Sequence, residues 1–113
     1  MIPRRGDIWL VELDPVEGHE QAGRRPALVL SVDAFNASRA DLVTVLPITS
    51  KSRVSVPSRV EIVPPEAGLK VKSYVIGEQV RTISLGRLVK RLGSVSPDTM
   101  KTTGDVVRML LGL

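Results

Sequence analysis

A series of short apolar runs, each ended by turn-forming or charged residues, is the feature that most limits what this chain can fold into. The runs lie at residues 7–14, 26–32, 42–48, 58–64 and 73–84. Two of them, 26–32 and 42–48, are continuously aliphatic or β-branched, which is typical of strands buried on both faces. Gly77 interrupts the last run and indicates a bulge or a close backbone approach. Residues 88–96 begin like a turn or a helix and end as a further short strand.

The spacing of apolar residues changes after residue 96, from that of strands to that of a helix. Ser96 is a good N-cap, Pro97 suits the first helical position, and Asp98 complements the helix dipole. The apolar face of this helix is expected to consist of Met100, Val107, Leu110 and Leu111. Many short strands followed by one amphipathic helix predict a mainly β fold, either a small β-barrel or a bent sheet closed by the helix.

Length and composition fit one globular domain spanning residues 1–113 and exclude several classes of site. The chain has no cysteine, so disulfides and thiolate metal sites are excluded. Sixteen Lys and Arg against twelve Asp and Glu give a net charge of +4, which suits a polyanionic partner without requiring one. One Trp, one Tyr and one Phe are too few for a broad platform on which bases stack. The N-terminal segment does not fit a signal peptide, and no run is long enough to span a membrane, so we expect a cytoplasmic protein.

Polar donors and charges are concentrated in the loop before the second strand, in the sequence "GHEQAGRRPALVLS". Arg25 precedes a proline, which restricts its backbone to extended conformations. A guanidinium held there, at the edge of a rigid sheet, could bind a phosphate through two hydrogen bonds. Alternatively, Arg24 and Arg25 are solvated charges that pair with Glu17 or Glu20.

A second polar segment follows the third apolar run. It contains Thr49, Ser50, Lys51, Ser52 and Arg53. Hydroxyls and cations concentrated at the end of a strand can form an anion site, although a polar turn would have the same composition.

His19 is the only histidine of the chain. A catalytic pair of histidines and a zinc site with several histidines are therefore excluded. A single histidine in a loop is either a surface residue or a group that transfers protons, and the residues alone leave both open. The carboxylates show no metal-binding spacing.

Three blocks in this order resemble the MazF/PemK family of toxin endoribonucleases, also called mRNA interferases. The blocks are "RRGDIWLVELDPVEGHEQAGRRPALVLS" at 4–31, "VLPITS" at 45–50 and "GEQVRTIS" at 77–84. The resemblance implies an SH3-like small β-barrel of the CcdB/PemK type with a terminal helix, usually a homodimer. It also implies a toxin of a type II toxin–antitoxin system that cleaves single-stranded RNA at a preferred sequence, without metal or other cofactor. Messenger RNA is the expected substrate.

The resemblance also implies roles for individual residues. Arg25, before the proline of G-x-R-P, matches the catalytic arginine of the family, and Thr49 at the end of "PIT" matches its catalytic threonine. Glu20 and Gln21 match the loop that borders the RNA. Gln79 and Arg81 match a segment beside the site. The remaining residues that we expect to contact RNA are Arg24, Ser50, Lys51 and Arg53.

The chemistry expected of such a site needs no nucleophile from the protein. The 2′-hydroxyl of the RNA attacks the adjacent phosphate, which leaves a cyclic phosphate and a 5′-hydroxyl end. Arg25 would neutralise the charge that develops on the nonbridging oxygens, and the Thr49 hydroxyl would add a donor. Arginine stays protonated in proteins and is a poor base. His19 is a candidate for the base, the acid or a reader of a base edge, because histidine titrates near neutral pH. Many relatives have a small residue such as serine there.

Two other functions are compatible with the same barrel. A CcdB-like poison of DNA gyrase would bind an enzyme without being one. However, CcdB-like toxins end their helix with a tryptophan, whereas this chain ends "RMLLGL" and has its tryptophan at position 9. A nucleic-acid-binding barrel without activity is the second alternative, and the presence of Arg25 and Thr49 argues against it. The expected protein partner is a cognate antitoxin with an extended acidic or apolar segment that covers the RNA groove.

Overall fold

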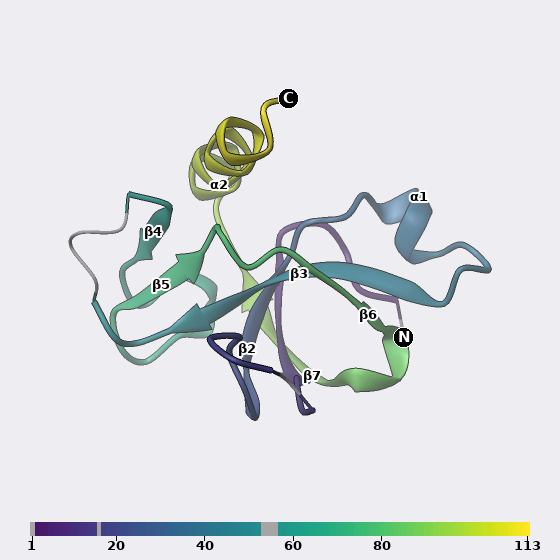
Figure 1. Ribbon diagram of the computed structural model, residues 1–113. Coiled ribbons are helices and arrows are strands. Elements are labelled where there is room, and N and C mark those ends of the chain that lie inside the picture. Colours follow the sequence, from purple (N-terminus) through teal and green to yellow (C-terminus); the bar gives the residue numbers. More distant parts are fainter. Residues whose placement is uncertain (1, 16, 53–56) are drawn as a thin grey trace.

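The computed structural model describes residues 2–15, 17–52 and 57–113 (Figure 1). The strands are β1 (Asp7–Glu12), β2 (Arg24–Val29), β3 (Leu42–Thr49), β4 (Arg59–Ile62), β5 (Ser73–Ile76), β6 (Arg81–Ser84) and β7 (Leu88–Ser94). The α-helices are α1 (Asp33–Asn36) and α2 (Pro97–Leu111), and two short 3₁₀ turns are η1 (Glu66–Gly68) and η2 (Leu85–Arg87). The predicted mainly β fold with a C-terminal helix is therefore confirmed.

The strands form one bent antiparallel sheet with the order β4-β5-β3-β2-β1-β7, and β6 pairs with β3. The described residues form no strand pairing between β4 and β7, so the sheet does not close into a barrel, which is a correction to the expected closed barrel. The turn η1 lies against β7 instead. A Cβ added at Gly93 would come within 2.4 Å of the Ala67 carbonyl oxygen. Because Ala67 has a φ of 60° and is not extended, this contact cannot continue a strand ladder.

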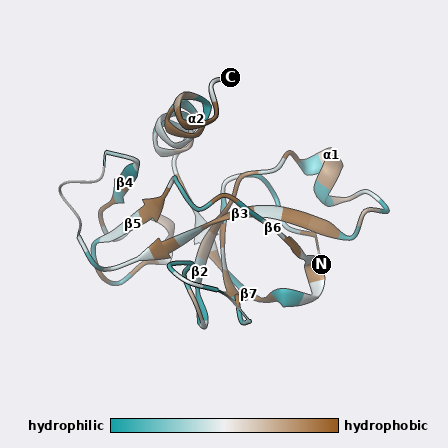
Figure 2. Cartoon of the chain, viewed as in Figure 1, coloured by the Kyte–Doolittle hydropathy of each residue, from teal (hydrophilic) through white to brown (hydrophobic). Residues whose placement is uncertain are grey.

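The central strands are buried on both faces, as their continuous apolar runs predict. Successive residues of β1, β2 and β3 alternate between two core clusters. Ile8 and Leu46 belong to the cluster that α2 covers through Val107, whereas Trp9 and Val45 belong to the other. Figure 2 shows the hydrophobic colouring along much of β3. This double burial fixes the register of the strands that carry the site, because a slip by one residue would exchange the two faces.

The run at 73–84 forms two strands instead of one. β5 pairs with the C-terminal end of β3, where Ile48 lies opposite Val75, and β6 pairs with its N-terminal part. The chain leaves the sheet between them at Gly77, where an added Cβ would be 2.5 Å from the Ser58 carbonyl oxygen. The close backbone approach predicted at Gly77 is thus confirmed. Residues 77–80 therefore connect the strand that pairs with Ile48 and Thr49 to the strand that pairs with Leu42–Val45.

Helix α2 begins as predicted, since the Ser96 hydroxyl accepts a hydrogen bond from the Thr99 amide and Pro97 is the first helical residue. The predicted buried face is correct only in its first part. Val107 is buried and Met100 packs against the core, but Leu110 and Leu111 are 45% and 58% exposed. Every residue after Val107 is exposed, so the last turn of the helix does not pack against the core. Figure 1 shows the position of α2 beside the sheet. No helix in the described ranges has the length and apolar character needed to cross a membrane.

Candidate functional site

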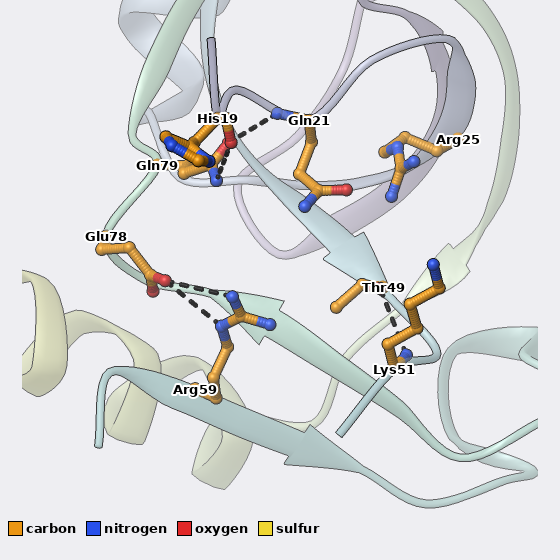
Figure 3. Close-up of a pocket in the computed structure, with 8 residues that line it drawn as sticks. All are labelled: His19, Gln21, Arg25, Thr49, Lys51, Arg59, Glu78 and Gln79. Carbon is orange, nitrogen blue, oxygen red and sulfur yellow. Dashed lines mark hydrogen bonds and ion pairs between the residues drawn. The ribbon is translucent and has the colours of Figure 1, made fainter. Parts of the chain in front are cut away.

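A pocket of about 410 Å³ lies where the β1–β2 loop, the end of β3, the start of β4 and the β5–β6 turn meet (Figure 3). Its walls are formed by His19, Gln21, Arg25, Thr49, Lys51, Arg59, Glu78 and Gln79. The structure thereby brings together residues from all three sequence blocks. Arg59 and Glu78 are additional to the residues expected from the sequence.

Arg25 reaches the pocket from β2 and is oriented by backbone carbonyls. Its Nε donates to the Ala22 oxygen at 3.0 Å, and its Nη1 lies 3.5 Å from the Ile48 oxygen. Among the described residues no carboxylate lies within ion-pairing distance of Arg25, whereas Arg24 pairs with Glu12 at 3.7 Å. Arg25 therefore does not pair with Glu17 or Glu20, which was the alternative expected from the sequence. The Arg25 charge remains available to an anion.

Thr49 lies opposite Arg25 on the neighbouring strand. Ala27 pairs with Pro47, and continuing this antiparallel register by two residues on each strand sets Arg25 against Thr49. A step of two residues keeps both side chains on the same face of the sheet. The Thr49 Oγ1 accepts a hydrogen bond from the Lys51 amide at 3.2 Å. Because a hydroxyl has one donor and two acceptor sites, its proton is left to donate to a bound group.

The β1–β2 loop is held over the pocket by the side chain of Gln79. Its Oε1 accepts a hydrogen bond from the Gln21 amide at 2.8 Å, and its Nε2 donates to the His19 carbonyl oxygen at 3.2 Å. The base of the loop is tied by the Gly23 amide, which donates to the Asp14 carboxylate at 3.0 Å. These contacts place His19 and Gln21 on the pocket wall (Figure 3).

Arg59 and Glu78 form an ion pair at the opposite wall, with 3.2 Å between Nη2 and Oε2. The Ser58 hydroxyl donates to the other Glu78 oxygen at 2.6 Å. Partial burial opposes ionisation of Glu78, but hydrogen bonds from Ser58, from its own backbone amide and from Arg59, together with the Arg59 charge, outweigh it and lower the pKa of the carboxyl. Alternation along residues 58–64 predicts that Arg59 faces away from Val60, but not that this face lines a pocket.

Other residues expected at the site lie around the pocket. Glu20 and Arg81 line an adjoining hollow of about 240 Å³, where Arg81 Nη1 is buried and has no hydrogen-bond partner in the described part of the chain. Ser50 lines a third, more apolar pocket that shares Arg25, Thr49 and Lys51 with the first. Arg24 is exposed and lines none of these three hollows. Arg53 lies outside the described residues.

The pocket favours anions. Arg25, Lys51 and Arg59 contribute three positive charges, and Glu78 contributes one negative charge. Two guanidiniums and a hydroxyl supply hydrogen-bond donors of the kind that recognise phosphate oxygens. Within the described ranges, no group of three histidine, cysteine or acidic side chains is arranged to hold a metal ion.

Comparison with known proteins identifies close relatives. A family model for the PemK-like, MazF-like toxins of type II toxin–antitoxin systems matches residues 4–111. Endoribonuclease MazF9 of Mycobacterium tuberculosis is 36% identical over 114 residues, which cover 97% of each protein. The crystal structure of MazF (Form-I) from Deinococcus radiodurans matches with a TM-score of 0.88 and 30% identity, over 100% of this chain and 99% of that one. A mycobacterial endoribonuclease in complex with its cognate antitoxin matches with a TM-score of 0.77 and 26% identity, over 99% and 95% of the two chains.

Proposed function

This chain belongs to the PemK-like, MazF-like family of toxins of type II toxin–antitoxin systems, and on that basis we propose that it is an endoribonuclease acting at the pocket of Arg25 and Thr49. The observation that carries the proposal is the pairing of an uncompensated guanidinium with a free hydroxyl donor across two neighbouring strands. The 36% identity to an endoribonuclease over nearly the full chain supports the same activity.

In the proposed reaction, the 2′-hydroxyl of single-stranded RNA attacks the adjacent phosphorus, and the bond to the 5′-oxygen of the next nucleotide breaks. Arg25 and the Thr49 hydroxyl donate hydrogen bonds to the nonbridging oxygens, where negative charge develops. Donors that are already oriented stabilise this charge without reorganising during the reaction. Arg25 meets this condition because two backbone carbonyls orient its guanidinium. The products are a cyclic phosphate and a 5′-hydroxyl end.

The reaction requires that the 2′-hydroxyl lose a proton and that the leaving 5′-oxygen gain one. We assign this proton transfer to His19, which lines the same pocket and is the only histidine of the chain. Gln79 supports this role by fixing the backbone at His19.

The proposed substrate is single-stranded RNA, recognised at a short sequence by the β1–β2 loop. Loops on a rigid sheet are common sites of specificity. We further propose a homodimer and a cognate antitoxin whose acidic or apolar segment covers the positively charged pocket. The complex of the similar mycobacterial endoribonuclease with its cognate antitoxin supports the second proposal.

The proposed activity is tested by incubating the purified protein with a long single-stranded RNA in the presence of EDTA and mapping both ends of every cut. We expect cuts at a recurring sequence, cyclic or 3′-phosphate ends upstream, and 5′-hydroxyl ends downstream. A requirement for added metal, or 5′-phosphate ends, would exclude the proposed reaction. Random cut positions would exclude sequence specificity while leaving the reaction intact.

A further inference from the structure

We propose that Arg59 binds a backbone phosphate of the RNA next to the phosphate held by Arg25 and Thr49, so that the pocket holds two consecutive phosphates. This inference rests on the proposed function and adds a binding residue to it. Arg59 is at the start of β4, in a segment that carries none of the family motifs quoted above.

The position of Arg59 separates it from the first phosphate site. Strand β4 is separated from β2 by β5 and β3 in the sheet. Because neighbouring strands are about 4.8 Å apart, the Arg59 and Arg25 backbones are roughly 14 Å apart along the sheet. Figure 3 shows the two side chains entering the pocket from opposite sides. Two guanidiniums that enter one pocket from opposite sides can each contact a different phosphate of one RNA strand.

The burial of Arg59 shows that its guanidinium is aimed inward. Its side chain is only 10% exposed, although it lines the pocket. A buried side chain of this kind has already lost most of its freedom, so that binding to it costs little further conformational entropy. The neighbouring Val60 points into the core and fixes the strand from which Arg59 projects.

The ion pair with Glu78 leaves part of the guanidinium free. Nε and Nη2 both contact the same oxygen, Oε2, at 3.3 Å and 3.2 Å. A guanidinium has five N–H donors, and Nη1 makes no hydrogen bond within the described part of the chain. Glu78 stays ionised at neutral pH, and its pKa is lowered. It therefore orients Arg59 while leaving some N–H donors of the guanidinium free.

The test measures RNA binding as a function of salt, because each phosphate contact adds to the salt dependence. The probe is a fluorescent, mixed-sequence 2′-O-methyl RNA oligonucleotide, which lacks the attacking hydroxyl and stays intact. For Arg59→Gln we expect the slope of log K against log salt to decrease in magnitude by about 0.7, the value for one contact to a single strand. Arg59→Lys should retain the slope of the unmodified protein. Arg39→Gln makes the same change of charge at an exposed position outside the pocket and should also retain it.

A second variant separates a phosphate contact from a general effect of charge. Arg59→Gln leaves Glu78 unpaired, whereas the double variant Arg59→Gln/Glu78→Gln removes both charges together. We expect the double variant to show the same reduced slope as the single variant. An unchanged slope in Arg59→Gln, or a slope restored in the double variant, would overturn the inference. Thermal unfolding of each variant establishes that it is folded.

The outcome for Arg59 is independent of the outcome for the proposed function. If the unmodified protein neither binds the oligonucleotide nor cleaves RNA, the proposed function fails. If it does both and the Arg59→Gln slope does not change, only the inference about Arg59 fails.

Discussion

Replacement of Gln79 by alanine should release the β1–β2 loop from the pocket without unfolding the protein. The Gln79 amide makes two hydrogen bonds to the loop backbone, at 2.8 Å to the Gln21 amide and at 3.2 Å to the His19 oxygen. A hydrogen bond contributes about 0.5–1.5 kcal/mol net, so the pair contributes about 1–3 kcal/mol to closing the loop. The equilibrium constant for local opening of the loop should increase by roughly 5- to 150-fold, since 1.4 kcal/mol corresponds to about a factor of ten.

The assay is amide hydrogen exchange measured residue by residue. The Gln21 amide proton is bonded to the side chain that is removed, so its exchange should accelerate by this factor in Gln79→Ala. Gln79→Glu keeps an acceptor for Gln21 but loses the donor to His19, and it should show an intermediate rate. Core amides such as that of Leu28 serve as the internal control. If the Gln21 amide exchanges at the same rate in Gln79→Ala and in the unmodified protein, the loop is held by other contacts and the reasoning is refuted.

Three further predictions concern the packing, the ion pair and proton transfer. Gly93→Ala should lower the free energy of unfolding by about 1–3 kcal/mol in urea titrations, because its Cβ would be 2.4 Å from the Ala67 oxygen, whereas Gly86→Ala, with 3.7 Å to its nearest atom, should change it little. Because the pKa of Glu78 is lower in the folded than in the unfolded protein, its ionised carboxylate stabilises the fold at pH values above the ordinary glutamate pKa of about 4.3. This stabilisation is lost as the pH falls through the pKa of Glu78 in the folded protein. Unfolding titrations should therefore show a steeper loss of stability below about pH 4 in the unmodified protein than in Glu78→Gln. His19→Ala should lower the rate of RNA cleavage, because His19 is proposed to transfer the proton, and an unchanged rate would exclude this role.

The strands and the helix could be predicted from the sequence because their signals are local. In β1 to β4, apolar residues alternate with polar ones where one face of the strand is buried and follow each other without interruption where both faces are buried. Ser96 and Pro97 mark the start of α2. The features that were predicted wrongly depend on tertiary structure. The division of residues 73–84 into two strands follows from β3, which is long enough to pair with both at different ends. The exposure of Leu110 and Leu111 depends on how far along α2 the packing against the core extends, and its last buried residue is Val107.

The residues of the site were predictable only where a motif or a strand end marked them. Arg25 and Thr49 lie at the ends of apolar runs, and the family resemblance assigns their roles. The contribution of Arg59 could not be predicted, because its strand reads as an ordinary alternating strand and its partner Glu78 is nineteen residues away. The use of the Gln79 side chain to hold the loop likewise depends on a contact across 58 residues. Such contacts between distant segments leave no periodic signal in the sequence.

The central claim, that Arg25 stabilises the charge of the transition state, is tested most directly by single-turnover cleavage of RNA in EDTA. Arg25→Ala should lower the rate by roughly 100- to 1000-fold, the usual cost of losing one oriented donor to a developing charge. Arg108→Ala, at an exposed position of α2 that does not line the pocket, removes the same charge and should cleave at the rate of the unmodified protein. A rate for Arg25→Ala within a few-fold of the unmodified protein would contradict the account.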